Sequence, residues 1–179
     1  MANSRPATAL PFGPARMRPV FEWTRPATHV LLRVVAALLF MQHGAQKLLG
    51  VLGGVDGSGA TVPLLSLLGL AGVLELFGGA LILVGLLVRP VALLLAGEMV
   101  AAYIMAHLPR GGFPVQNQGE LALVYAALFV FLLGNGAGAW SLDHWIGERR
   151  ARREERAMPP AERTARTPEQ SRRARHTAA

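Results

Sequence analysis

Eight polar side chains lie within otherwise apolar stretches of this sequence and are the groups that could do chemistry there: His43, Gln46, Lys47, Glu75, Glu98, Tyr103, His107 and Glu120. Imidazole, amine and phenol groups donate hydrogen bonds, and carboxyls exchange protons. No His-x-x-x-His or Glu-x-x-His spacing occurs, and the chain has no Cys, so neither a metal site nor thiol chemistry is predicted. The set favours a pocket that hydrogen-bonds a quinone or a small anion.

The distribution of charge shows what kind of protein positions these groups. The chain has 179 residues, 52% hydrophobic and only 16% charged. Residues 1–28 carry a net charge of +3 and residues 146–179 a net charge of +5, whereas residues 29–145 carry −1. An almost uncharged middle between two basic ends is typical of a membrane protein. Because the basic residues lie in the tails, nucleic-acid binding is not predicted.

The apolar middle predicts an all-α integral membrane four-helix bundle with short loops and disordered basic tails. A membrane helix needs about 20 mostly apolar residues, and four candidates lie at 29–50, 66–88, 90–108 and 119–137. Turn residues separate them, among them Arg89-Pro90 and the stretch 109–114. The expected organisation is a Pro- and Arg-rich leader at 1–28, a membrane domain at 29–146 and an Arg-rich, disordered tail at 147–179.

The basic ends also predict an orientation. Lys and Arg are concentrated on the cytoplasmic side of membrane proteins, so we expect both termini in the cytoplasm. The alternative for the first span is a cleaved signal peptide, but no small-x-small cleavage site follows it. Arg33, near the inner end of this span, is expected to extend to the headgroups.

The orientation places most of the candidate residues at one level of the membrane. His43, Gln46 and Lys47 share one face near the outer end of the first span. The second, third and fourth spans would bring Glu75, His107 and Glu120 to the same outer half, with Tyr103 on the face of His107 and Glu98 near the midplane. The sequence therefore predicts one polar site in the extracytoplasmic half of the bundle.

Glu75 gives the sharpest local prediction. Its neighbours three and four positions away are Ala71, Gly72, Gly78 and Gly79, and such a small-residue face lets membrane helices approach closely. Glu75 should therefore point into the bundle, where a carboxyl must be neutral or paired. We expect it to meet Lys47 or His43. Such a pair could also serve only to fix the helix register.

Several motifs, in order, carry a resemblance to a known family: FMQHGAQKL at 40–48, GVLELFGG at 72–79, LLVRP at 86–90, FP at 113–114, GELAL at 119–123 and GNGAG at 134–138. They resemble the DoxX family over about residues 29–146. The resemblance implies a small inner-membrane protein with four helices that acts as an oxidoreductase or as a subunit of one. Relatives are linked to thiosulfate:quinone oxidoreductase and to complexes that handle thiol or oxidative stress.

Three functions follow as hypotheses. The first is a redox-linked protein that binds a quinone or a small sulfur compound, with His43, Lys47 and Glu75 as the catalytic set and Gln46, Glu98, Tyr103, His107 and Glu120 binding the ligand. Without Cys, such a role needs a quinone or another cofactor, or a soluble redox partner. The second is a small-solute permease or exporter, and the third is an anchor that recruits a soluble enzyme. Membrane lipids and a second copy of the chain are the other expected partners.

Overall fold

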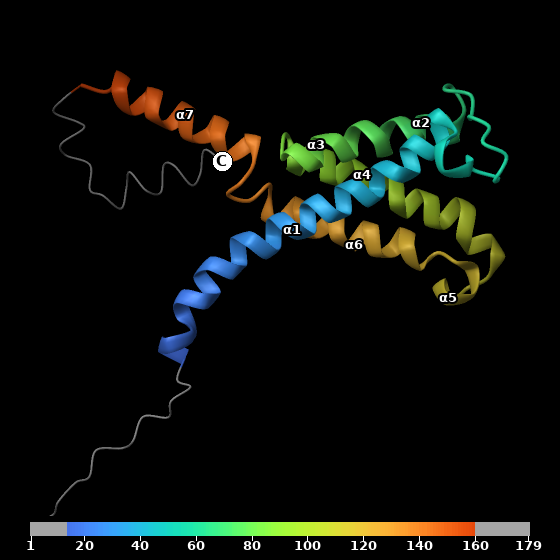
Figure 1. Ribbon diagram of the computed structural model, residues 1–179, viewed down its shortest axis with the longest axis horizontal. Coiled ribbons are helices and arrows are strands. Elements are labelled where there is room, and N and C mark those ends of the chain that lie inside the picture. The colour runs from blue at the N-terminus through green and yellow to red at the C-terminus, as the bar shows by residue number, and fades with distance from the viewer. Residues whose placement is uncertain (1–13, 160–179) are drawn as a thin grey trace, which may run out of the picture.

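The computed structural model describes residues 14–159, with side chains from Thr24 onward, and the regular structure of this part is helical (Figure 1). Three stretches, Thr24–Leu49, Leu67–Val84 and Val88–Arg110, are long and apolar enough to cross a membrane. A shorter apolar helix, Glu120–Asn135, packs with them. The chain is thus an all-α membrane protein. The fourth helix has 16 residues, about 24 Å of rise, and is short for a hydrocarbon layer of about 30 Å.

The first span is part of one long helix, α1 (Pro14–Leu49), followed by a 3-10 turn, η1 (Val51–Gly53). Residues 14–28, which belong to the predicted leader, form the first part of this helix. Pro14 opens this helix, where its missing N–H costs nothing. The rest of the leader, residues 1–13, lies outside the described residues.

The second span is one continuous helical stretch with a wider turn at its centre. It consists of α2 (Leu67–Val73), the π-helical turn η2 (Leu74–Gly78) and α3 (Gly79–Val84). Ser66 begins it by accepting a hydrogen bond from the Gly69 amide, and Gly85, at φ 72°, ends it. A positive φ favours glycine because it has no Cβ.

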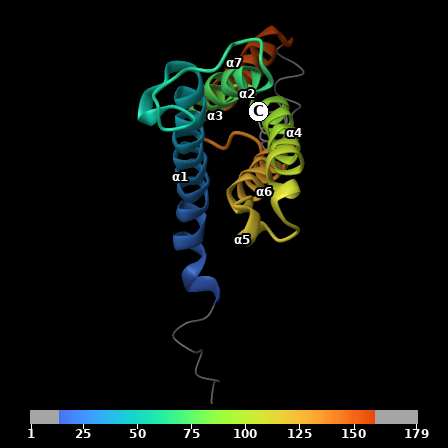
Figure 2. The same cartoon turned by 90° about the vertical axis from the view of Figure 1, so that its right-hand side faces the viewer.

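The third and fourth spans run side by side. The third comprises α4 (Val88–Ala102), a second π-helical turn η3 (Tyr103–His107) and the 3-10 turn η4 (Leu108–Arg110). A short helix, α5 (Pro114–Asn117), leads to α6 (Glu120–Asn135). Figure 2 shows α1 on one side of the bundle and α4 with α6 on the other.

The basic tail begins as a helix, α7 (Leu142–Ala157), which extends away from the bundle (Figure 1). The sequence of the tail is compatible with disorder or with a loose helix, and the structure is helical as far as Ala157. The Ser141 hydroxyl caps the helix by accepting from the His144 amide, and Arg152 pairs with Glu148 four positions earlier. A cap and such pairs stabilise a helix that has little apolar surface to bury. Residues 160–179 lie outside the described part.

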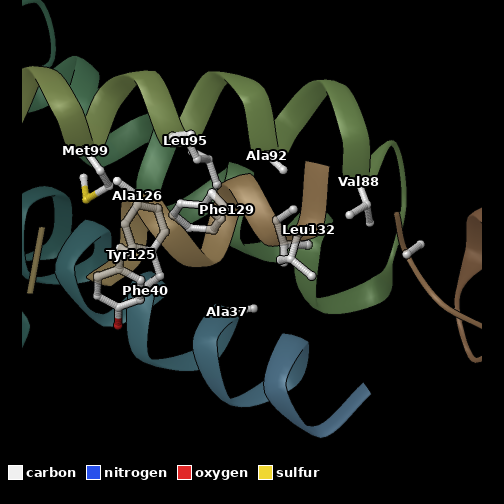
Figure 3. Close-up of a cluster of buried hydrophobic side chains, with 13 residues drawn as sticks. Ala37, Phe40, Val88, Ala92, Leu95, Met99, Tyr125, Ala126, Phe129 and Leu132 are labelled. Atoms are coloured by element: carbon white, nitrogen blue, oxygen red, sulfur yellow. The ribbon is translucent and has the colours of Figure 1, made fainter. Parts of the chain in front are cut away.

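The centre of the bundle is an aromatic cluster joined by small residues (Figure 3). Phe40 of α1 lies with its ring centroid 4.8 Å from that of Phe129 and 5.0 Å from that of Tyr125, both on α6. Leu95 of α4 covers the cluster, and Ala37, like other small residues there, lets the helix backbones approach. This packing holds α1, α4 and α6 at fixed positions around the polar groups described below.

Arg33 is where the structure departs most clearly from the sequence-based expectation. The prediction that it extends to the headgroups is wrong, because the residue is only 2% exposed. Its guanidinium donates to the carbonyls of Ala137 and Trp140, which follow the end of α6. Exposed carbonyls at a helix end need donors, and a cation is favoured there by the helix dipole. Arg33 thus ties α1 to the exit of α6.

Candidate functional site

Glu75 lies inside the bundle, in the π-helical turn η2, and is 4% exposed. The small residues beside it make the predicted close contacts. A Cβ at Gly72 would lie 3.0 Å from the Lys47 Cβ, and a Cβ at Gly79 would lie 2.6 Å from Met41 of α1. The prediction that the small-residue face turns Glu75 into the bundle is confirmed. Single π turns are frequent at functional sites.

Lys47 is the partner of Glu75. It is one of the two residues, Lys47 and His43, that the sequence predicts for this contact. The Lys47 Nζ contacts both carboxylate oxygens of Glu75, forming an ion pair between α1 and η2. The side chains are 16% and 5% exposed, respectively. Because breaking such a pair leaves one buried charge without a counter-ion, the two residues depend strongly on each other.

Glu98 of α4 is a third ionisable group close to this pair. It is within electrostatic reach of both Glu75 and Lys47. Both of its carboxyl oxygens are buried, and neither has a hydrogen-bond partner among the described residues. An ionised carboxylate without partners is very costly in an apolar environment, so we treat Glu98 as a neutral carboxylic acid.

These three residues line one groove of about 710 Å³ between the second span and α4. The walls are formed by apolar side chains that are exposed on the outside of the bundle, including Leu67, Leu70, Leu93, Leu94 and Met105. A Cβ at Gly97, which also lines the groove, would meet nothing within 4 Å. The groove therefore has mainly apolar walls that are exposed at the surface of the bundle, and its polar end consists of Lys47, Glu75 and Glu98.

His43 and Gln46 do not line the groove. The ring of His43 meets that of Tyr125 edge to face, with centroids 6.1 Å apart, and His43 is half-buried. Gln46 is half-buried as well, and the described residues offer it no hydrogen bond. His43 thus lies one turn from Lys47, behind the polar end of the groove.

Tyr103 and His107 belong to a second polar cluster, built around Asn117. Their rings stack, with centroids 6.4 Å apart, and the Asn117 amide donates to the Tyr103 hydroxyl (3.5 Å) and the Gly111 carbonyl (2.7 Å). The His107 Nδ1 lies 3.1 Å from the Asn117 carbonyl oxygen. This cluster closes the connection between η3 and α6, and it does not line the groove.

The sequence-based set is thus divided rather than gathered in one place. Lys47, Glu75 and Glu98 share the groove, Tyr103 and His107 share the Asn117 cluster, and Glu120 is exposed at the start of α6. Sequence reasoning missed Asn117, which is 1% exposed, because a single Asn in a loop carries no sign that its amide is buried. Within the part of the chain that the structure describes, no three His, Asp or Glu residues are placed to hold a metal ion.

Comparison with known proteins agrees with the fold. The DoxX family matches residues 28–108, which include most of the first and third spans, the whole second span, and Lys47, Glu75 and Glu98. An uncharacterized protein of Haemophilus influenzae is 40% identical over 128 residues, covering 69% of this chain and 93% of its own length. An uncharacterized membrane protein of Mycobacterium tuberculosis is 31% identical over 138 residues, covering 69% of this chain and 84% of its own length. No solved structure matches. On these similarities, the chain belongs to the DoxX family.

Proposed function

We propose that the protein is a redox-linked subunit of the bacterial inner membrane that binds a quinone in the groove between the second span and α4. The observation that carries this proposal is the combination of an apolar groove of about 710 Å³, with walls exposed at the surface of the bundle, and the Lys47–Glu75 pair at its polar end. Ligand sites of this kind have mostly apolar walls and a few polar groups that fix orientation.

The chemistry of the groove suits a quinone better than a small sulfur anion. A quinone has an apolar tail that partitions into lipid and a ring with carbonyl oxygens that accept hydrogen bonds. Lys47 can donate one hydrogen bond beyond the two it directs at Glu75. A small sulfur anion would leave the apolar walls unfilled and would lie close to two carboxyls. Glu75 in this scheme orients Lys47 and keeps its charge compensated.

Electron transfer to or from this quinone requires another component, because the chain contains no Cys. We propose a soluble redox partner, with the basic helix α7 and the tail as its contact surface. Arg33 of α1 and the segment that follows α6 meet through the hydrogen bonds of Arg33 to the carbonyls of Ala137 and Trp140. This arrangement supports placing both termini on the same side, and the excess of Arg favours the cytoplasm.

The proposal is tested with a substitution that fills the groove and leaves the helix packing unchanged. Gly97→Leu places a side chain in open space inside the groove, and Gly134→Leu on α6 is the matched control, because a Cβ there also meets nothing within 4 Å and Gly134 does not line the groove. Binding of a decyl-substituted benzoquinone to the purified protein in detergent is measured by equilibrium dialysis against protein-free micelles.

We expect Gly97→Leu to weaken binding by at least about tenfold, a loss of roughly 1.4 kcal/mol, and Gly134→Leu to bind as the natural protein does. Equal thermal unfolding of the two variants would show that folding is not the cause. The proposal fails if the natural protein binds no more quinone than the micelles do, or if Gly97→Leu leaves the affinity unchanged.

A further inference from the structure

The polar end of the groove can offer hydrogen-bond donors to a ligand. An ammonium group has three N–H donors, and two of those of Lys47 point at the two oxygens of Glu75. Each of those oxygens thereby accepts one hydrogen bond from Lys47, and the ammonium keeps one donor for a ligand. Glu75 itself is too deeply buried, at 5% side-chain exposure, to be the first group that a ligand meets.

Glu98 adds a second donor if it is held as the neutral acid, as its buried and unpartnered oxygens indicate. A neutral carboxyl carries one O–H group. Its oxygens are covered, but Gly97 beside it leaves open space, so a rotation of the flexible Glu98 side chain would bring the O–H to a ligand. Among the described residues, Glu98 has no ion-pair or hydrogen-bond partner that would occupy it.

We propose that Glu98 and Lys47 together recognise a carbonyl oxygen of the quinone ring, and that Glu98 makes the groove selective for the oxidised quinone over the quinol. This inference rests on the proposed function. A quinone carbonyl accepts hydrogen bonds from both donors, whereas a quinol hydroxyl must also place its own hydrogen. Only hydrogen bonds form on binding, and no electron moves.

The charged groups around Glu98 determine how binding depends on pH. Lys47 comes from α1 and Glu75 from η2, and both act on Glu98 directly. His43 lies within reach of Lys47, and Tyr125 of α6 lies within reach of Glu75. If Glu98 loses its proton, its donor disappears and a negative charge is left beside the quinone carbonyl. The affinity for quinone therefore falls as the pH rises.

The experiment compares the natural protein with Glu98→Gln and with Glu154→Gln, a matched change on the exposed face of α7. Binding of a decyl-substituted benzoquinone and of its quinol is measured by equilibrium dialysis in detergent from mildly acidic to alkaline pH. An amide keeps an N–H donor at every pH. We therefore expect quinone affinity to fall roughly tenfold or more with rising pH in the natural protein and in Glu154→Gln, and to stay constant in Glu98→Gln.

Two results would overturn the inference. One is a Glu98→Gln variant that keeps the same pH dependence as the natural protein, and the other is equal affinity of the natural protein for quinone and quinol at acidic pH. If Gly97→Leu binds the quinone as tightly as the natural protein does, the quinone does not bind in the groove. That result would instead refute the proposed function on which the inference rests.

A second readout needs no variant and so covers the case in which Glu98→Gln does not fold. Infrared difference spectra of the natural protein, recorded with and without the quinone, report the C=O stretch of protonated carboxyls. We expect a shift of this band when the quinone binds at acidic pH. An unchanged band in a sample that binds quinone would contradict a hydrogen bond from Glu98.

Discussion

Lys47 and Glu75, 28 positions apart in the chain, form an ion pair that joins α1 to the π-helical turn of the second span. The pair is nearly enclosed, and the Lys47 stem packs against Gly72 of the same span. A contact of this kind is strongly interdependent, because each charge is tolerated in the apolar interior only while the other is present.

A double-mutant cycle on this pair measures that interdependence. We expect Lys47→Met and Glu75→Gln each to lower the free energy of unfolding by about 3–5 kcal/mol, because each leaves a buried polar group without its partner. The decrease in the free energy of unfolding of the double variant should be clearly smaller than the sum of the decreases of the two single variants. Unfolding in a mixed-micelle titration gives the values, and strictly additive losses would show that the two side chains are not coupled.

The Lys47–Glu75 pair could be predicted from the sequence because a charged side chain inside a membrane helix has few possible partners. An isolated carboxylate in hydrocarbon needs a partner, the glycines around Glu75 show which way it faces, and few cations lie at the same level. The spans were predictable for a similar reason, since long apolar runs have few other uses. The predicted second and third spans differ from the observed stretches, Leu67–Val84 and Val88–Arg110, by no more than four residues at either end.

The division of the candidate site could not be predicted, because spacing along a helix gives depth but not the direction around the bundle. Tyr103 and His107 lie at the expected end of the third span, yet they face Asn117 and not Lys47. Arg33 has the sequence pattern of an arginine that reaches the headgroups, and its actual acceptors belong to residues more than 100 positions away. Contacts of such long range have no local signature.

Gly44 should be among the positions least tolerant of a larger side chain. A Cβ there would lie 2.7 Å from the Gly72 carbonyl oxygen and 2.8 Å from the Leu76 Cβ, so α1 and the second span would have to separate. We expect Gly44→Ala to cost about 1–3 kcal/mol of folding free energy. Gly134→Ala, in open space, is the control and should be neutral or slightly stabilising; a neutral Gly44→Ala would argue against the close approach.

Full stability of the fold should require an arginine at position 33. Arg33→Gln loses the charge and the forked donor that reach two carbonyls, and hydrogen bonds from charged groups contribute about 1.5–3 kcal/mol each. We expect a loss of at least about 2 kcal/mol, with Arg33→Lys intermediate because an ammonium lacks the planar fork. Exposed Arg150 of α7 provides the control substitution, Arg150→Gln. Similar stability of Arg33→Gln and Arg150→Gln would contradict the role given to Arg33.

The loop between the first two spans offers a prediction on pH. The hydroxyl and the amide of Ser58 donate to the Asp56 carboxylate at 2.6 and 3.0 Å, and they hold the pKa of Asp56 below its usual range. Because the pKa of Asp56 is lower in the folded loop than in the unfolded chain, the ionised carboxylate stabilises the folded loop at pH values above the pKa of the unfolded chain. This stabilisation is lost as the pH falls through the pKa of the folded loop. Ser58→Ala should move the pKa of Asp56 back toward normal in a carbon-detected NMR titration. An unchanged pKa would show that the hydroxyl does not bond the carboxylate in solution.

Asp143, in the first turn of α7, connects α7 to the start of α4 through hydrogen bonds. Its removal should destabilise the backbone locally at the start of α4. Its carboxylate accepts from the amides of Leu87 and Val88 at 2.8 and 3.0 Å, and its own amide donates to Gly85. An acidic cap on the first amides of a helix contributes about 1–2 kcal/mol, in part through the helix dipole.

We therefore expect Asp143→Ala to speed hydrogen exchange of the peptide covering 85–91, measured by mass spectrometry in detergent, while peptides of α2 and of the loop 51–61 exchange as before. Asp143→Asn should lie between, because an amide oxygen still accepts one hydrogen bond but carries no charge. Glu148→Gln, six residues beyond the start of α7, controls for a loss of negative charge near this end of the bundle. Since the two backbone donors are the Leu87 cap and Val88, the first residue of α4, an exchange rate at 85–91 that does not respond to Asp143→Ala would mean that α7 does not stabilise the α3–α4 turn.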